Sequence, residues 1–171
     1  AALVPCVLSA LIANVISSLF GVASTSFTLA AIPELSAISL LQAIGLGIVF
    51  GALASLFCRA MHMGGTLYKK IENPYLRIVV GGCIVVLLSL LVRSGNYNGA
   101  GMSVISAALA GHAVPWAFAL KIVFTVLTLG AGFKGGEIVP CFFVGATCGC
   151  VVAPLLGMDA GFGAALGLIA V

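Results

Sequence analysis

The chain has 171 residues, of which 63% are hydrophobic and only 6% charged, and its mean hydropathy is +1.33. A soluble domain of this length would not carry so much apolar surface, and the apolar residues come in long blocks, so the chain is expected to be a helical integral membrane protein and not a β-barrel. The formal net charge of +3 does not indicate nucleic-acid binding, because the basic residues do not form one solvated patch.

The apolar blocks predict helices that span the membrane wholly or in part. They cover residues 2–21, 36–57, 76–92, 114–129, 138–156 and 161–171, and a shorter helix is predicted over 102–110. The first block lacks a basic leading region and is longer than a signal-peptide core, so it is interpreted as a spanning helix. Because the chain has no initiator methionine and stops inside an apolar run, residues 1–171 are expected to be a single transmembrane domain that is a fragment of a larger protein.

The connections between these blocks suggest an orientation in the membrane. Residues 22–34 are rich in Ser and Thr, end in Pro33-Glu34 as a helix start, and are placed outside. Residues 58–75 are interpreted as a cytoplasmic loop, because excess positive charge marks the inner side. The charged residues in and next to this loop are Arg59, Lys69, Lys70 and Arg77 against Glu72. An anionic lipid site would also use such charges, but membrane topology is sufficient to explain them.

Small residues recur within the blocks. Glycine pairs at a spacing of four allow helix backbones to approach closely in a membrane; they are Gly47/Gly51, Gly145/Gly149, Gly157/Gly161 and Gly163/Gly167. The six cysteines form no CxxC pair and have no matching histidines, so neither a zinc site nor a disulfide framework is indicated. No cofactor is expected.

The stretch GAGFKGGEIVP at 130–140 is the strongest functional signal. It places Lys134 and Glu137, together with four glycines and Pro140, between two apolar runs. Ionisable groups at membrane depth cost about 2.5–3.5 kcal/mol each on insertion scales, so they are candidates for function. Glycine and proline interrupt the helix, and an interrupted helix with a charged residue is a common way to build an ion site in transporters.

A new helix is predicted to start at the end of this stretch, because Pro140 suits a first helical turn. The free N–H groups of Gly136, Glu137 and Ile138 would then form an anion cradle. One helix terminus contributes only about 0.3–2 kcal/mol, so this loop is expected to be part of a larger site. Burial would favour the protonated form of Glu137, which can donate a hydrogen bond to an anion and expel the anion when the proton is lost. This benefit is greatest for fluoride.

Other interpretations of the ionisable residues remain open. Lys134 and Glu137, three residues apart, can form an ion pair that only holds the loop. Lys121 lies in the middle of an apolar run, where it would snorkel or pair with a carboxylate, and a structural role is favoured.

Two histidines and two aromatic residues lie near predicted helix ends. His62 and His112 are interpreted as interfacial residues and not as ligands, and Tyr97 and Trp116 as interfacial anchors.

The sequence GGEIVPCFFVGATCG resembles the signature GGxFxPxxxxGAxxG of the CLC family of chloride channels and proton-coupled anion antiporters. KIVFTVLTLGAGFKGGEIVP is most similar to the fluoride-exporting branch, in which a glutamate replaces an apolar residue of chloride-type members. GLGIVFGALASLFCRAM and RSGNYNGAGMSVISAAL also resemble, in order, segments of the second half of that family. The resemblance implies an all-α membrane protein: a polytopic bundle of tilted and broken helices that forms one inverted-repeat half of a CLC-type fold.

The resemblance also implies roles for residues. Glu137 and Ile138 would give amides to the anion, within an anion-binding stretch that includes Gly135, Gly136 and Val139. The Glu137 side chain would be the coupling carboxylate, and Lys134 and Lys121 are candidate supporting charges. Val139 departs from the threonine of some fluoride-branch members. The first half of the family, with its first anion loop and gating glutamate, and the C-terminal tyrosine helix are not in this chain.

The function implied by the resemblance is fluoride/proton antiport in a bacterial inner membrane, not enzymatic catalysis. The implied partners are a halide, protons, membrane lipid and a second copy of the protein, with the first and last helices facing that copy. Alternatives are a chloride-selective CLC channel or exchanger in which Glu137 is only tolerated, a proton- or cation-coupled carrier in which Lys134 and Glu137 bind a zwitterionic solute, and a membrane scaffold without transport.

Overall fold

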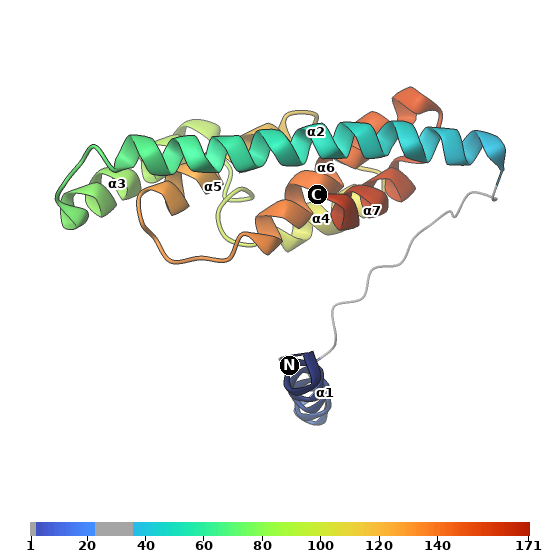
Figure 1. Ribbon diagram of the computed structural model, residues 1–171, viewed down its shortest axis with the longest axis horizontal. Coiled ribbons are helices and arrows are strands. Elements are labelled where there is room, and N and C mark those ends of the chain that lie inside the picture. Colours follow the sequence, from blue (N-terminus) through green and yellow to red (C-terminus); the bar gives the residue numbers. More distant parts are fainter. Residues whose placement is uncertain (1–2, 23–35) are drawn as a thin grey trace.

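The computed structural model describes residues 3–22 and 36–171, and every regular element in these ranges is a helix (Figure 1). The α-helices are α1 (Leu3–Leu19), α2 (Ala37–Tyr68), α3 (Pro74–Val92), α4 (Met102–Leu109), α5 (Ala117–Gly130), α6 (Ile138–Val152) and α7 (Ala160–Ala170), and a 3₁₀ turn η1 (Ala153–Leu156) continues α6. The seven predicted helices are therefore confirmed in order, with shifts at their ends. Of the external connection predicted at 22–34, only Val22 lies among the described residues.

Three helical segments are long and apolar enough to cross a membrane by length and composition. These are Ala37–Tyr68, Pro74–Val92 and Ile138–Leu156, whereas the apolar helices at Val4–Leu19, Ala117–Gly130 and Ala160–Ala170 are shorter. In α1, residues 4–16 are all exposed, so this helix buries none of its apolar side chains against the rest of the described chain.

Polar residues at the helix starts explain several boundaries. Ser36 caps α2 in a capping box with Ser39, in which each side chain binds the backbone N–H of the other residue. Asn73 caps α3 just before Pro74, and the Asp159 carboxylate accepts the Phe162 N–H at the start of α7. Such caps satisfy N–H groups that have no partner within the helix.

Helix α2 is longer than the sequence indicated, and the loop predicted at 58–75 is wrong for residues 58–68. The connection between α2 and α3 is limited to residues 69–73, and Arg77 lies in the first turn of α3. The basic residues of this stretch predicted a loop, but a Cβ on Gly64 would collide with the Val126 side chain of α5. Gly64 is therefore a site of close helix contact, and the helix continues through it.

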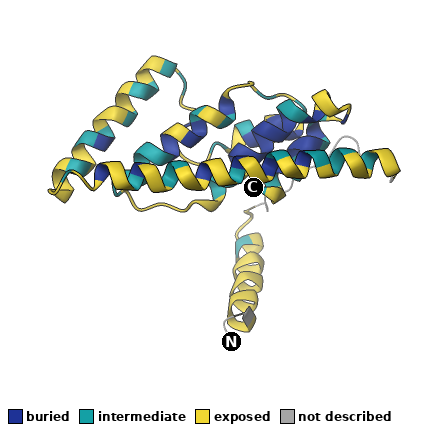
Figure 2. Ribbon diagram, turned by 45° about the horizontal axis from the view of Figure 1, so that its top comes forward, coloured by how far each residue is buried: buried dark blue, intermediate teal, exposed yellow. Residues whose placement is uncertain are grey.

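The core of the bundle is α6, which contacts α4, α5 and α7 and is buried from Phe143 to Cys150. Figure 2 shows these turns as the most continuously buried part of the molecule, in contrast to the exposed α1. A Cβ on Gly145 would collide with the Gly167 carbonyl, and one on Gly149 with the Gly163 carbonyl. The glycine pairs of α6 and α7 thus interlock as their spacing predicts, whereas Gly47 and Gly51 face open space.

Residues 93–101 connect α3 to α4 as a turn region, and Tyr97 within it is not an interfacial anchor. Its side chain is only 8% exposed, stacks on Phe124 with 5.9 Å between ring centroids, and meets Phe143 edge-on at 6.2 Å. The turn folds back over the bundle because Arg93, Gly99 and Gly101 adopt positive φ angles. Trp116, by contrast, is 62% exposed.

The interlock between α6 and α7 can be tested with a single methyl group. We expect Gly149→Ala to lower the free energy of unfolding by roughly 1–3 kcal/mol, because the added Cβ meets a backbone carbonyl that cannot rotate away. The measurement is denaturant or thermal unfolding in detergent. Gly51→Ala, which adds the same methyl group where space is open, is the matched control and should cause no loss; equal losses in both variants would contradict the interlock.

Candidate anion site at the start of α6

The predicted break in the helix is present, since α5 ends at Gly130 and α6 begins at Ile138. Residues 131–137 connect them in an irregular loop, which begins with Gly132 at a φ of +101°. Arg77 of α3 donates its Nε to the Ala131 carbonyl at 3.2 Å, and a Cβ on Gly132 would lie 3.1 Å from the Arg77 Nη2. Arg77 therefore fixes the start of the loop, a role that its assignment to a basic loop did not suggest.

The end of the loop presents free backbone donors. Glu137 is the N-cap of α6; its carbonyl accepts the Cys141 N–H at 3.1 Å, and its side chain makes no capping hydrogen bond. The N–H groups of Glu137, Ile138 and Val139 have no hydrogen-bond partner among the residues described, as expected for a helix start. Gly135, Gly136 and Ile138 are exposed, the last by 68%, so these donors are open to a ligand.

Glu137 is exposed in this chain, so the burial expected from the sequence is not observed here. Lys134 is also exposed, and the described ranges contain no ion pair between the two side chains, so the loop is not held in the way that the structural alternative requires. Instead, Glu137 lines a cavity of about 350 Å³ together with residues of α2, which are Phe57, Cys58, Met61 and His62. Sequence reasoning missed this neighbourhood because it ended the helix at residue 57.

Lys121 lies in the interior, where it does not snorkel and pairs with no carboxylate of the described residues. Its side chain is 2% exposed, and its Nζ donates to the Tyr97 carbonyl at 3.1 Å and to the Gly99 carbonyl at 2.6 Å. The same Nζ lies 5.0 Å from the centroid of the Phe143 ring, within the range of a cation–π interaction. One cation thus links α5, the 93–101 turn region and α6.

A second cavity, of about 240 Å³, connects this lysine with the loop. Lys121, Asn98 and Thr125 lie on one part of its lining, and Gly136 and Pro140 bring it to the start of α6. The Lys121 side chain therefore borders the same cavity as the start of α6.

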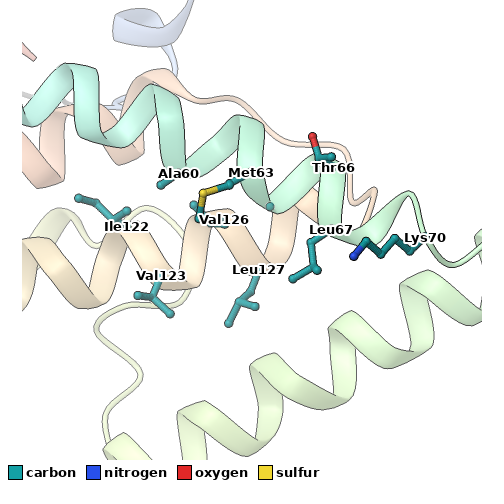
Figure 3. A pocket seen from close by; sticks show the side chains of 10 residues that line it. Ala60, Met63, Thr66, Leu67, Lys70, Ile122, Val123, Val126 and Leu127 are labelled. Atoms are coloured by element: carbon teal, nitrogen blue, oxygen red, sulfur yellow. The ribbon is translucent and has the colours of Figure 1, made fainter.

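A third, apolar groove runs between α2 and α5, away from the loop (Figure 3). Side chains of α2 and α5 such as Met63, Leu67, Ile122 and Val126 line it, and Lys70 lies at its end. Its lining offers few polar groups to hold a dehydrated ion, so the start of α6 remains the better candidate site.

Comparison with known proteins places this arrangement in a family. The model of the voltage-gated chloride channel family matches residues 1–171, so the chain belongs to this family, the CLC family, and is an integral membrane protein. It is 35% identical, over 99% of its length, to a chloride/fluoride channel protein of Pseudomonas syringae pv. tomato, and 29% identical, over 92%, to the voltage-gated ClC-type chloride channel ClcB of Salmonella dublin. The chain spans about 39% of the length of each.

Among solved structures, the chain is similar to a CLC-type fluoride/proton antiporter. The TM-score is 0.89 at 34% sequence identity, and the match covers 98% of this chain and 43% of the antiporter chain. The all-helical, CLC-type fold implied by the sequence resemblance is therefore confirmed.

The interior position of Lys121 leads to a stability prediction. We expect Lys121→Met to destabilise the protein by about 1–3 kcal/mol, because the buried Tyr97 carbonyl and the part-buried Gly99 carbonyl lose their donor. Unfolding in detergent measures this loss. Lys134→Met removes the same ammonium group from an exposed position and should change stability little; a Lys121→Met protein as stable as this control would show that the two hydrogen bonds contribute nothing.

Proposed function

We propose that this chain is the second inverted-repeat half of a protein that exchanges fluoride for protons across a bacterial inner membrane. The observation that carries the proposal is the interrupted helix, whose restart offers unpartnered amides at residues 137–139 and carries a carboxylate at its N-cap. The similarity to a solved fluoride/proton antiporter and to a chloride/fluoride channel protein supports it.

In this proposal the halide binds at the start of α6. The amides of Glu137 and Ile138 donate to it, Val139 lies in the same turn, and Gly135 and Gly136 let the anion approach the backbone without a Cβ in the way. The positive end of the helix contributes about 0.3–2 kcal/mol. This is too little to replace the hydration of a small anion, so the remaining donors come from the rest of the full-length protein.

Glu137 couples the anion to protons. A protonated carboxyl donates a hydrogen bond to fluoride, the strongest acceptor among the halides, and a carboxylate at the same place repels it. The face of Glu137 that is exposed in this chain is, in our proposal, covered by the first half of the transporter, which removes water and strengthens both effects.

Charges elsewhere fit this assignment. Lys121, fixed in the interior beside the second cavity, and Lys134 in the loop both favour an anion nearby. The basic residues in the second half of α2, in the connection after it and at the start of α3 support a cytoplasmic position for this end of the bundle under the positive-inside rule; they are Arg59, Lys69, Lys70 and Arg77. The exposed apolar side chains of α1 are suited to a homodimer contact, with the end of α7 facing the same partner.

Chloride transport by the same site is the second candidate. It is favoured by the similarity to a ClC-type chloride channel and by Val139, which offers no hydroxyl to a fluoride ion.

Efflux from liposomes that contain the full-length protein separates the candidates. We expect fluoride release coupled to proton counterflow, reduced about 10²-fold or more in Glu137→Gln, because the amide cannot exchange a proton. Glu72→Gln, in the exposed connection after α2, is the matched control and should transport normally.

Two other outcomes would contradict the proposal. Chloride release that is indifferent to Glu137→Gln would assign the protein to chloride-type members. Solute uptake without halide movement would indicate the carrier in which Lys134 and Glu137 bind a zwitterion.

A further inference from the structure

The cavity shared by Glu137 and α2 contains a second titratable group that the proposed mechanism has not used. We propose that His62 relays protons between the cytoplasmic solution and Glu137. This inference rests on the proposed fluoride/proton exchange and adds to it a route by which the proton reaches the coupling carboxylate.

One face of α2 points toward the start of α6. Phe57, Cys58, Met61 and His62 line the cavity with Glu137, and their spacing of one, four and five residues puts them on one side of the helix. Phe57 and Leu53, which lies one turn earlier in α2, also share a buried cluster with Val144 and Cys148 of α6. The packed contact between the two helices therefore opens, near the first turn of α6, into the cavity that holds both ionisable side chains.

The cavity has the size and lining that proton transfer needs. Its volume of about 350 Å³ is many times larger than the roughly 30 Å³ that one water molecule occupies in the liquid. Proton transfer requires hydrogen-bond contact between donor and acceptor, directly or through water. His62 is exposed, and its side chain makes no hydrogen bond among the described residues, so both ring nitrogens are available.

Few other ionisable groups face this space. Cys58 lines the cavity from the same face of α2, and Cys141 lies in the first turn of α6. Neither Arg59 nor Lys134 lines the cavity. An imidazole can accept a proton on one ring nitrogen and donate one from the other, so His62 is the group best suited to pass protons to Glu137.

The transfer is a simple proton exchange. The N–H bond of the His62 imidazolium breaks, the proton passes directly or through water to a carboxylate oxygen of Glu137, and an O–H bond forms there. The neutral imidazole then takes a proton from the solution. In the opposite direction of the cycle the same steps run in reverse.

The test is proton and fluoride flux by the full-length protein in liposomes, with His62→Ala as the first variant. We expect proton-coupled flux to fall roughly tenfold, while fluoride affinity measured by calorimetry stays unchanged. Imidazole added to the buffer should restore the flux, because a small base can occupy the vacated space in the cavity. A histidine with a merely structural role would not show this rescue.

Two further variants sharpen the result. His62→Gln should lose flux in the same way without rescue, because its side chain fills the space without titrating. His112→Ala, which removes the other histidine at an exposed position, is the matched control and should transport normally.

The outcomes distinguish the relay from the exchange on which it rests. A wild-type protein that moves protons with fluoride, beside a His62→Ala variant of equal flux or one that imidazole fails to restore, would overturn the relay alone. A wild-type protein without fluoride-driven proton movement would overturn the proposed function together with the relay.

Discussion

The arrangement depends on one constraint: backbone N–H groups within a membrane need a partner. Continuous helices meet this need by themselves, but the restart of α6 at Ile138 leaves amides that nothing in the described chain satisfies. Such a helix end is stable at membrane depth only beside protein or a watery cavity. Unsatisfied N–H donors make a break in a membrane helix energetically costly, and the same donors can bind an anion. The cost in stability and the proposed anion binding therefore come from one feature.

The rest of the described fold keeps this helix end in place. Arg77 fixes the first residues of the loop, and Lys121 holds the 93–101 turn region against Phe143 of α6. Both cations act on backbone carbonyls or an aromatic ring, and no carboxylate among the described residues pairs with either of them.

Much of this could be predicted from the sequence, for identifiable reasons. Gly130 to Pro140 contains helix-breaking residues and charges together, so the break and the restart of α6 could be located. The glycine spacing predicted close helix contacts in a packed bundle, but the sequence did not indicate that α6 and α7 are the partners that meet. Two features depend on how the 93–101 turn region folds back onto the bundle: the burial of Tyr97 and the hydrogen bonds that Lys121 donates to two carbonyls. This is a tertiary contact, and no local pattern in the sequence indicates it. The basic residues after position 57 were interpreted as a loop, so α2 was ended too early and His62 was not recognised as a neighbour of Glu137.

The interlock of α6 with α7 has a consequence for how such a protein can move. Backbone atoms of Gly145 and Gly149 rest against carbonyls of Gly167 and Gly163, so there is no slack for one helix to slide or roll along the other. Any alternation between inward and outward access must then leave this pair as a stationary frame. In the proposed transport cycle, movement would then come from parts of the protein outside this helix pair.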